Sequence, residues 1–367
     1  MASLKPHAVL FALVAGAAFP LRGQDSPLGI QGLGTPGRFE SARARATGGA
    51  LAAFDPLSVL TEASVSGLTR LTATATGAAS YLTDEIAGER DSRRGSRFPL
   101  FQIGGRAWSN IVLAAGFSTY LDRTYHVVIR DSIVLGGSSQ AITDDLSADG
   151  GVTDVRLVAA RQFGHLALGA GLHLLAGSTR FQFVRTFEDT SIYAAVSQSG
   201  EVAYRGSGLS ASAILTVGRR MQVAAFYRSD THLRSEEEGA TVARNDLPTT
   251  AGGAFRWLPT PDVTLAAAVL RRSWATAVDS NAYNTTSWSA GAEFGRQVPL
   301  RVGVRGGDLP FGPGGRAPRE LAFALGTGRV FADGRGIIDV AFERLRRTGA
   351  GLTETGWTAL LTVAVRP

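Results

Sequence analysis

The chain has 367 residues with 45 glycines, no cysteine and a formal net charge of +6. The lack of cysteine excludes disulfides, thiolate catalysis and cysteine-ligated metals. The arginines are scattered and form no basic stripe interleaved with aromatics, which argues against a nucleic-acid partner. Abundant glycine without long apolar runs is typical of a protein with many strands and turns.

The first 24 residues have the features of a secretory signal peptide. Lys5, the only lysine, precedes an apolar run at 8–19 that is too short to span a bilayer, and small residues follow it. No later stretch approaches about 18 consecutive apolar residues, so we expect no transmembrane helix in the mature chain. These features predict a periplasmic, secreted or outer-membrane protein.

Residues 25–64 precede the repeated pattern of the rest of the chain. Their second half, "RARATGGALAAFDPLSVLTEAS" at 43–64, is rich in glycine and alanine and carries an Asp-Pro pair. Such a stretch is too short to form a long helix and lacks the alternation of a strand. We therefore treat 25–64 as a separate segment that lies ahead of the first strand.

From residue 65 onward the chain alternates between two kinds of side chain with a period of two. In 221–229, "MQVAAFYRS", every second residue is apolar, and the same alternation recurs in 287–295, 299–307 and 337–345. A period of two is the pattern of a strand with two different faces. One face is apolar, and the other carries charged and small residues.

The links between these strands alternate strictly between short and long. Short links lie at 109–110, 163–165, 218–220, 258–262, 296–299 and 332–336, and long polar links at 81–97, 124–151, 176–206, 231–248, 275–286, 308–319 and 348–355. This asymmetry is typical of an outer-membrane barrel with short periplasmic turns and long extracellular loops. The count predicts an all-β fold: an antiparallel transmembrane barrel of 14 strands over 65–367, with both ends on the periplasmic side.

The tryptophans support a barrel in a membrane. All five lie at the ends of predicted strands, where amphipathic rings would form girdles at the two membrane interfaces: Trp108, Trp257, Trp274, Trp288 and Trp357.

We find no enzyme motif and predict a protein that is not an enzyme, with no cofactor and no metal. There is no G-x-S-x-G, H-E-x-x-H, P-loop or dinucleotide fingerprint, and the histidines lack metal-ligand spacing. Asp230 and His232 could serve as a base in an outer-membrane hydrolase. The simpler interpretation is that both are solvated residues at the rim of the barrel.

The polar face of the strands carries the candidate lumen residues. A charged group facing lipid near the midplane would cost about 2–4 kcal/mol, so these side chains mark the inside of the barrel. They are His173, Arg228, Glu293, Arg301, Arg305, Asp339 and Glu343. Two roles remain open for them: ion pairing that fills and stiffens the barrel, or contact with a permeating solute.

The later strands resemble those of the FadL-type long-chain fatty acid outer-membrane transporters. The segments that carry the resemblance are 208–229, 246–274 and 290–313, in which Leu247, Pro248, Gly253, Phe255 and Trp274 fit the family pattern. The stretch 43–64 is similar to the family's N-terminal segment. Its Gly48, Gly49 and Ala50 match the small cluster, while Glu62, Ala63 and Ser64 stand near the place of the family's Asn-Pro-Ala.

The resemblance implies that residues 25–64 fold into the lumen as a plug, or hatch. The plug residues are Gly48, Gly49, Ala50, Phe54, Asp55 and Pro56. It also implies passive uptake of hydrophobic small molecules, fatty-acid-like or aromatic, across the lipid of the outer membrane of a Gram-negative-type bacterium. The alternative is a structural or secretion-accessory barrel that binds a protein partner through extracellular loops such as 124–151 and 176–206.

Overall fold

The computed structural model describes residues 26–30, 32–38, 40–86, 88–108, 110–189, 192–276, 282–312, 316–349 and 351–367. The predicted signal peptide, 1–24, lies outside the described residues. Across the described part of the chain, no helix combines the length and the apolar character needed to cross a membrane.

Fourteen antiparallel strands form a closed barrel, which confirms the predicted fold class and strand count. They are β2 (Thr72–Ile86), β3 (Glu89–Trp108), β4 (Ile111–Asp122), β6 (Ser138–Phe163), β7 (Leu166–Phe187), β8 (Val196–Val217), β9 (Met221–Asp230), β12 (Thr250–Thr260), β13 (Val263–Arg272), β14 (Thr285–Phe294), β15 (Leu300–Asp308), β16 (Arg319–Phe331), β17 (Gly336–Gly349) and β18 (Leu352–Val365). The last strand, β18, pairs with the first, β2, over 14 residue pairs and closes the ring.

The alternation in the sequence sets the two faces of the barrel wall. In β16, Leu321, Phe323 and Leu325 are exposed on the outside, while Ala322 and Ala324 between them are buried. Successive side chains of a strand point to opposite faces, so one row covers the outside and the other fills the lumen. The inward residues are small or charged because the lumen is filled by another part of the chain.

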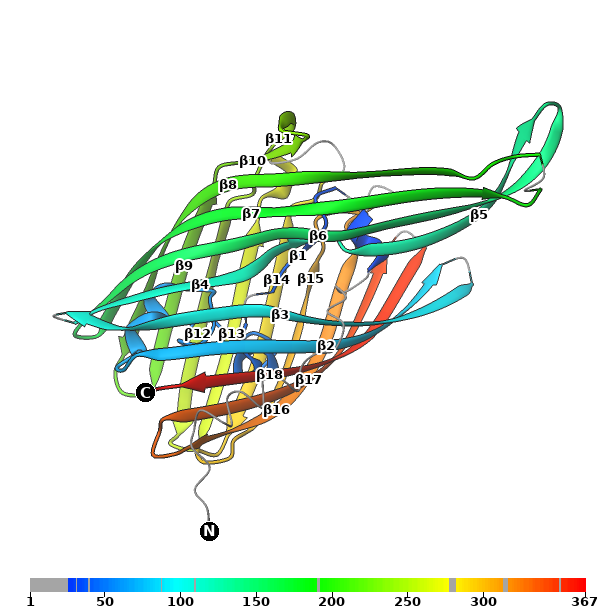
Figure 1. Ribbon diagram of the computed structural model, residues 1–367. Coiled ribbons are helices and arrows are strands. Elements are labelled where there is room, and N and C mark those ends of the chain that lie inside the picture. The colour runs from blue at the N-terminus through cyan, green and yellow to red at the C-terminus, as the bar shows by residue number, and fades with distance from the viewer. Residues whose placement is uncertain are drawn as a thin grey trace, which may run out of the picture.

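The barrel has two different ends. Six tight connections, such as those after β3 and β16, lie at one end, which we call the short-turn end (Figure 1). The chain ends there after β18. We call the opposite end the hairpin end.

At the hairpin end, most of the predicted long loops are in fact paired strands. β2 and β3 remain paired as far as Ile86 and Glu89, and β17 and β18 as far as Gly349 and Leu352. Residues 231–248 form the hairpin of β10 (His232–Glu237) and β11 (Ala240–Asp246). The loop prediction was wrong here because polar residues on both faces hide the alternation, while cross-strand pairing continues.

The longest extension is built from four strands. β5 (Tyr125–Leu135) pairs with the first half of β6, and β6, β7 and β8 continue their pairing far beyond the barrel. Figure 1 shows this four-stranded sheet protruding at the upper right. The loops predicted at 124–151 and 176–206 are therefore mainly strand. We call this part the protruding sheet.

Four of the five tryptophans are on the outside, and Trp274 is not. Trp108, Trp257, Trp288 and Trp357 are exposed. Trp274 begins the short helix η3 (Trp274–Thr276), is 1% exposed, and packs edge-on against Phe311 with ring centroids 5.2 Å apart. The girdle prediction was wrong for Trp274 because the chain turns inward after β13.

The described residues of 26–70, which we call the N-terminal segment, lie inside the ring of strands (Figure 1). The segment contains η1 (Pro27–Ile30), β1 (Thr35–Pro36), α2 (Ala42–Ala46) and η2 (Ala63–Gly67). β1 pairs with β4. α2 contacts β15 to β18, while η2 contacts β4, β6, β7 and β8, so the segment joins opposite sides of the wall.

An apolar core forms between the N-terminal segment and the wall. Leu51, Phe54 and their alanine neighbours pack against Ile214 of β8 and Phe226 of β9. Burial of such side chains stabilises the folded state by about 25 cal/mol per Å² of apolar surface removed from water. The core therefore holds the segment against β7, β8, β9, β12 and β13.

Candidate functional site

The C-terminal end of helix α2 packs against glycines of the barrel wall. A Cβ atom added to Gly303 would lie 2.0 Å from the carbonyl carbon of Thr47, and one added to Gly291 would lie 2.4 Å from the Thr47 oxygen. The chain then passes through Gly48 and Gly49, with φ angles of 68° and 95° that favour glycine. Backbone therefore packs directly on backbone at this point.

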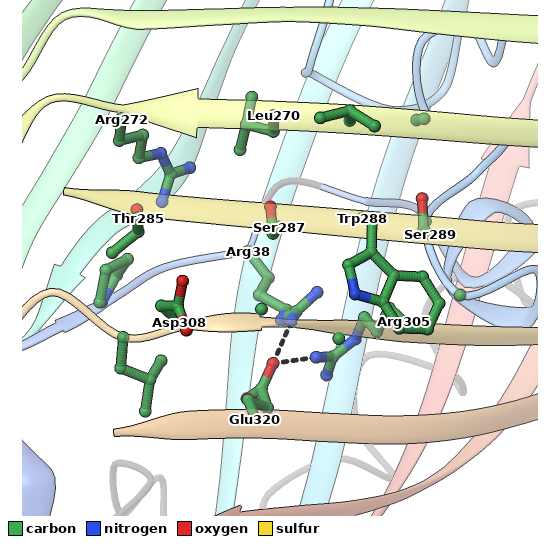
Figure 2. A pocket seen from close by; sticks show the side chains of 18 of the residues that line it. Arg38, Leu270, Arg272, Thr285, Ser287, Trp288, Ser289, Arg305, Asp308 and Glu320 are labelled. Atoms are coloured by element: carbon green, nitrogen blue, oxygen red, sulfur yellow. Dashed lines mark hydrogen bonds and ion pairs between the residues drawn. The ribbon is translucent and has the colours of Figure 1, made fainter. Parts of the chain in front are cut away.

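Ion pairs surround this contact on the side of the hairpin end. Three residues of the N-terminal segment and five of β15 to β18 take part; we call them the outer cluster: Arg38, Glu40, Arg45, Arg305, Glu320, Glu343, Arg347 and Glu354. Arg45 Nε donates to Glu343 at 2.9 Å, and Arg38 donates to Glu320 at 2.6 Å. Arg305 donates to both of these glutamates. Figure 2 shows Arg38 and Arg305 converging on Glu320.

The outer cluster contains four arginines and four glutamates, so its charges balance. Glu343 and Glu354 have no exposed surface. Each buried carboxylate needs its arginine, because an unpaired charge in such a place costs about 3–5 kcal/mol. The cluster ties the N-terminal segment to four strands at once.

Glu40 shows the electrostatic balance within the N-terminal segment. Burial alone would raise the pKa of its carboxyl group, but attraction by Arg38 and Arg45 outweighs burial and lowers the pKa below the usual 4.5. Glu40 therefore stays ionised at neutral pH and bridges the two arginines, at 3.3 Å and 3.1 Å.

A second group lies closer to the short-turn end. Both nitrogens of the Arg43 fork donate to Glu293, at 2.9 Å and 2.8 Å. Arg301 donates to Glu293 at 2.6 Å and to Asp339 at 2.6 Å. We call these four residues the inner cluster; it fixes the other face of helix α2 to β14, β15 and β17.

A third polar network holds η2 on the opposite wall. Ser210 of β8 donates to Glu62 at 2.6 Å, and its oxygen lies 2.7 Å from Nε2 of His173. Nδ1 of His173 lies 2.9 Å from Asp154, which also accepts a bond of 2.5 Å from Arg228. We call this set, from Glu62 to Arg228, the His173 network.

The strands give η2 room to approach this network. A Cβ atom at Gly169 would lie 2.5 Å from the Ala63 nitrogen, so at this position the backbone of β7 packs directly against the N-terminal segment. The Ala63 N–H donates to Ser212 at 2.8 Å.

Asp230 and His232, which could have served together as a catalytic base, have different partners. Asp230 is buried and accepts hydrogen bonds from Tyr120 at 2.9 Å and from Arg228. His232 pairs with Asp246 on the rim hairpin. The two side chains belong to separate networks, and among the described residues no group of His, Asp or Glu is arranged to hold a metal ion.

A cavity of about 130 Å³ lies between the N-terminal segment and the wall, toward the hairpin end (Figure 2). Leu60, Phe226, Ala268 and Leu270 give it an apolar side. Its other side is charged, with Arg38, Arg272, Arg305 and Glu320 among the lining residues. The cavity is therefore amphipathic.

A second cavity of about 330 Å³ lies toward the short-turn end. It is lined by Arg43, Asp55 and Pro56 of the N-terminal segment and by residues of the inner cluster. Of the segment, Arg43 and 55–57 border the second cavity, while 35–38, Glu40, 48–49 and Leu60 border the first. The segment stands between the two.

The seven candidate lumen residues all have inward-facing, largely buried positions, and they fall into three different networks. Arg305 and Glu343 belong to the outer cluster, Glu293, Arg301 and Asp339 to the inner cluster, and His173 and Arg228 to the His173 network. Of the six plug residues, Asp55 accepts hydrogen bonds from Ser41 and Ser58, and Phe54 is part of the apolar core.

Sequence reasoning missed several partners. Glu62 was noted only for its place near the family's Asn-Pro-Ala, and no role was predicted for Ser210, Asp154, Arg38 or Glu320. The position of Asp154 and Ser210 on the inward face of their strands was a usable signal. Nothing in the sequence, however, indicated which residue of the N-terminal segment each would meet.

The fold matches several solved structures over nearly the whole chain. A Pseudomonas aeruginosa FadL homologue matches with a TM-score of 0.62 and 11% identity, covering 91% of this chain and 99% of that one. The Ralstonia pickettii toluene transporter TbuX matches with a TM-score of 0.59 and 14% identity, covering 90% and 98%. The Pseudomonas putida toluene transporter TodX gives 0.58 and 13%, covering 90% and 99%.

These similarities confirm the predicted likeness to FadL-type barrels at the level of the fold. No protein-family model matches the sequence, and the search of curated proteins gives no match.

Proposed function

We propose that this protein is an outer-membrane barrel that admits hydrophobic small molecules, fatty-acid-like or aromatic, by passive diffusion from the cell surface. The observation that carries the proposal is the amphipathic cavity between the N-terminal segment and the wall. Binding pockets for small molecules are mostly apolar with a few placed polar groups, and this cavity combines both kinds of surface.

The N-terminal segment serves as the plug in this proposal. It separates the two cavities and is held by the outer cluster, the inner cluster and the His173 network. A solute that reaches the first cavity meets the backbone at Gly48 and Gly49. Passage then requires the segment to move, or the solute to leave through the wall.

The similar structures agree with this class of function. Two of them are described as toluene transporters and one as a FadL homologue. The exposed apolar outer face, seen in Leu321, Phe323 and Leu325, suits a wall in contact with lipid. The signal peptide predicted at 1–24 agrees with export to the outer membrane.

The first test is uptake of a labelled long-chain fatty acid and of labelled toluene by cells that carry the full-length protein. We expect faster uptake of at least one of them than by cells without the barrel. The proposal fails if neither solute enters faster than in the barrel-free control while the barrel is present in the outer-membrane fraction.

The cavity itself is tested by a pair of neighbouring variants. Ala268→Phe fills the cavity, because Ala268 lines it. Ala267→Phe puts the same ring on the outer face, where Ala267 is exposed. We expect Ala268→Phe to reduce uptake by about tenfold and Ala267→Phe to leave it unchanged. Equal uptake by both variants would place the transport path elsewhere.

The protruding sheet supports a second candidate function, in which the barrel binds a protein partner. Its strands expose Val128, Ile129, Val134 and Val196 to solvent. Large exposed apolar side chains of this kind are common at protein interfaces. Extraction of the barrel in mild detergent tests this function: a stable stoichiometric partner supports it, and migration as the barrel alone contradicts it.

A further inference from the structure

The outer face of the barrel carries a row of arginines and aromatic residues near the hairpin end. The strand register places Arg94 of β3 opposite Tyr81 of β2, Tyr81 opposite Trp357 of β18, and Trp357 opposite Arg344 of β17. Phe323 of β16 continues the row. Tyr81, Trp357 and Phe323 are 42%, 55% and 59% exposed, so the row faces outward.

Both arginines of the row lie over an aromatic ring. The guanidinium carbon of Arg94 lies 5.8 Å from the Tyr81 ring centroid, and that of Arg344 lies 5.1 Å from the Trp357 centroid. Aromatic rings of this kind mark a membrane interface, and such contacts hold the planar guanidinium groups in place. Toward the short-turn end, the outer face is apolar, with Phe342 and Leu361 exposed.

The next row toward the hairpin end is rich in hydroxyl groups. Arg346 lies opposite Thr355, Thr355 opposite Thr83, and Thr83 opposite Ser92. These residues alternate with inward ones, so they share the outer face with Arg344 and Arg94. A row of hydroxyl groups therefore runs beside the arginines, in which Thr83 and Ser92 share a hydrogen bond of 3.1 Å.

The three arginines have no carboxylate partner among the described residues. The nearby acidic groups are engaged elsewhere: Glu85 accepts from Arg90 at 3.0 Å, and Asp91 pairs with Arg93 at 3.1 Å. The surface formed by Arg94, Arg344 and Arg346, which we call the arginine patch, thus has a net positive charge above an apolar band.

We propose that the arginine patch binds the phosphate groups of a phosphorylated glycolipid in the outer leaflet of the membrane. Arginine binds phosphate with two parallel hydrogen bonds, and the hydroxyl row adds further donors. The aromatic row and the apolar band below it fit the acyl chains of the same lipid. An occupant with an anionic head and an apolar tail matches both surfaces at once.

The spacing suits a headgroup with more than one phosphate. Arg94 and Arg344 lie on strands three steps apart, which corresponds to about 14 Å at about 4.8 Å per strand. The proposal rests on the outer-membrane location in the proposed function, but not on transport through the lumen.

The test uses full-length protein purified from outer membranes in mild detergent. The phosphorylated glycolipid retained per barrel is measured by native mass spectrometry for the wild type and for the triple variant Arg94→Gln, Arg344→Gln, Arg346→Gln. The matched control is Arg106→Gln, Arg161→Gln, Arg329→Gln, which removes three exposed arginines near the short-turn end. Heat-dependent gel migration verifies that each barrel is folded, and cell fractionation verifies its location.

We expect retained glycolipid to fall about tenfold in the patch variant and to stay unchanged in the control. Two added competitors identify the ligand: the same glycolipid after removal of its phosphates should bind weakly, and inorganic phosphate should not displace the intact lipid. Equal retention by the patch variant and the wild type would overturn the proposal, as would equal binding of the dephosphorylated lipid or displacement by inorganic phosphate.

Fractionation and uptake keep this test separate from that of the proposed function. Barrels absent from the outer-membrane fraction would contradict the proposed location and the patch together. Glycolipid binding in barrels that take up no labelled solute would contradict transport alone. If both proposals hold, the patch variant should lose glycolipid and take up labelled solute as fast as the wild type.

Discussion

Glu62 of the N-terminal segment and Ser210 of β8 are joined by a buried hydrogen bond of 2.6 Å. The same serine oxygen lies 2.7 Å from His173, so the contact extends into the wall. Together with the bond from Ala63 to Ser212, it holds η2 on the side of the barrel opposite the outer and inner clusters.

Replacement of Glu62 should loosen this side of the N-terminal segment. Glu62→Ala removes the acceptor of the Ser210 hydroxyl, and loss of a buried hydrogen bond costs about 1–3 kcal/mol. We expect a several-fold rise in ion conductance of the protein reconstituted in planar bilayers. Glu62→Gln keeps an oxygen acceptor and should have a smaller effect, and the exposed Glu85→Ala should have none. A conductance equal to that of the wild type in Glu62→Ala would show that this bond does not hold the segment.

A methyl group at Gly303 should push the N-terminal segment away from the wall. The added Cβ atom would overlap the Thr47 backbone at 2.0 Å, and overpacking of this kind costs about 1–3 kcal/mol. We expect Gly303→Ala to lower the unfolding free energy in lipid vesicles and to speed proteolysis within 26–70. Gly253→Ala is the control, because its Cβ atom would be no closer than 3.4 Å to any neighbour. Similar results for both variants would contradict the close approach at Gly303.

Removal of Arg305 should destabilise the barrel more than removal of an exposed arginine. Arg305→Ala leaves Glu320 and the fully buried Glu343 short of a partner, at a cost of about 3–5 kcal/mol. Arg319 is 83% exposed and 3.8 Å from Asp308, so Arg319→Ala should change stability by less than about 1 kcal/mol. Unfolding in urea, followed by gel migration, measures the difference; equal midpoints would show that the outer cluster adds no stability.

Acid should release the N-terminal segment. The pKa of Glu40 is lowered in the folded protein, so its contribution is present above its unfolded value of 4.5 and is lost as the pH falls through the lower folded value. We expect proteolysis within 26–70 by pepsin to accelerate as the pH drops below about 4.5. Glu40→Gln should make the rate less dependent on pH in that range. An unchanged pH profile in the variant would assign the acid response to other groups.

The alternation along the chain was enough to predict the wall. Met221, Val223 and Tyr227 face outward, and Arg301, Arg305 and Glu343 face inward, as the period of two indicated. The cost of exposing charge to lipid determines which face is which, and that cost can be estimated from the sequence. The parity of short and long links then predicted the 14 strands.

The hairpin end was less predictable. The chain at 81–97 and 348–355 looks like loop because polar residues occupy both faces, yet it remains paired as far as tight turns. Here the outward face is polar, and the inward face carries buried polar residues such as Asp84 and Glu354, so the alternation of apolar and polar residues disappears while the backbone hydrogen bonds persist. Trp274 likewise has the sequence context of a strand end, but packs on Phe311 inside.

The sequence by itself determined the barrel, because its wall depends on a local rule: each residue faces either lipid or lumen, and its chemistry records which. The partners inside the lumen were decided only by the tertiary structure. Glu62 meets Ser210 across 148 positions of the chain, and Arg45 meets Glu343 across 298. Such pairs depend on how the N-terminal segment is placed within the closed ring, and no spacing along the chain encodes that placement.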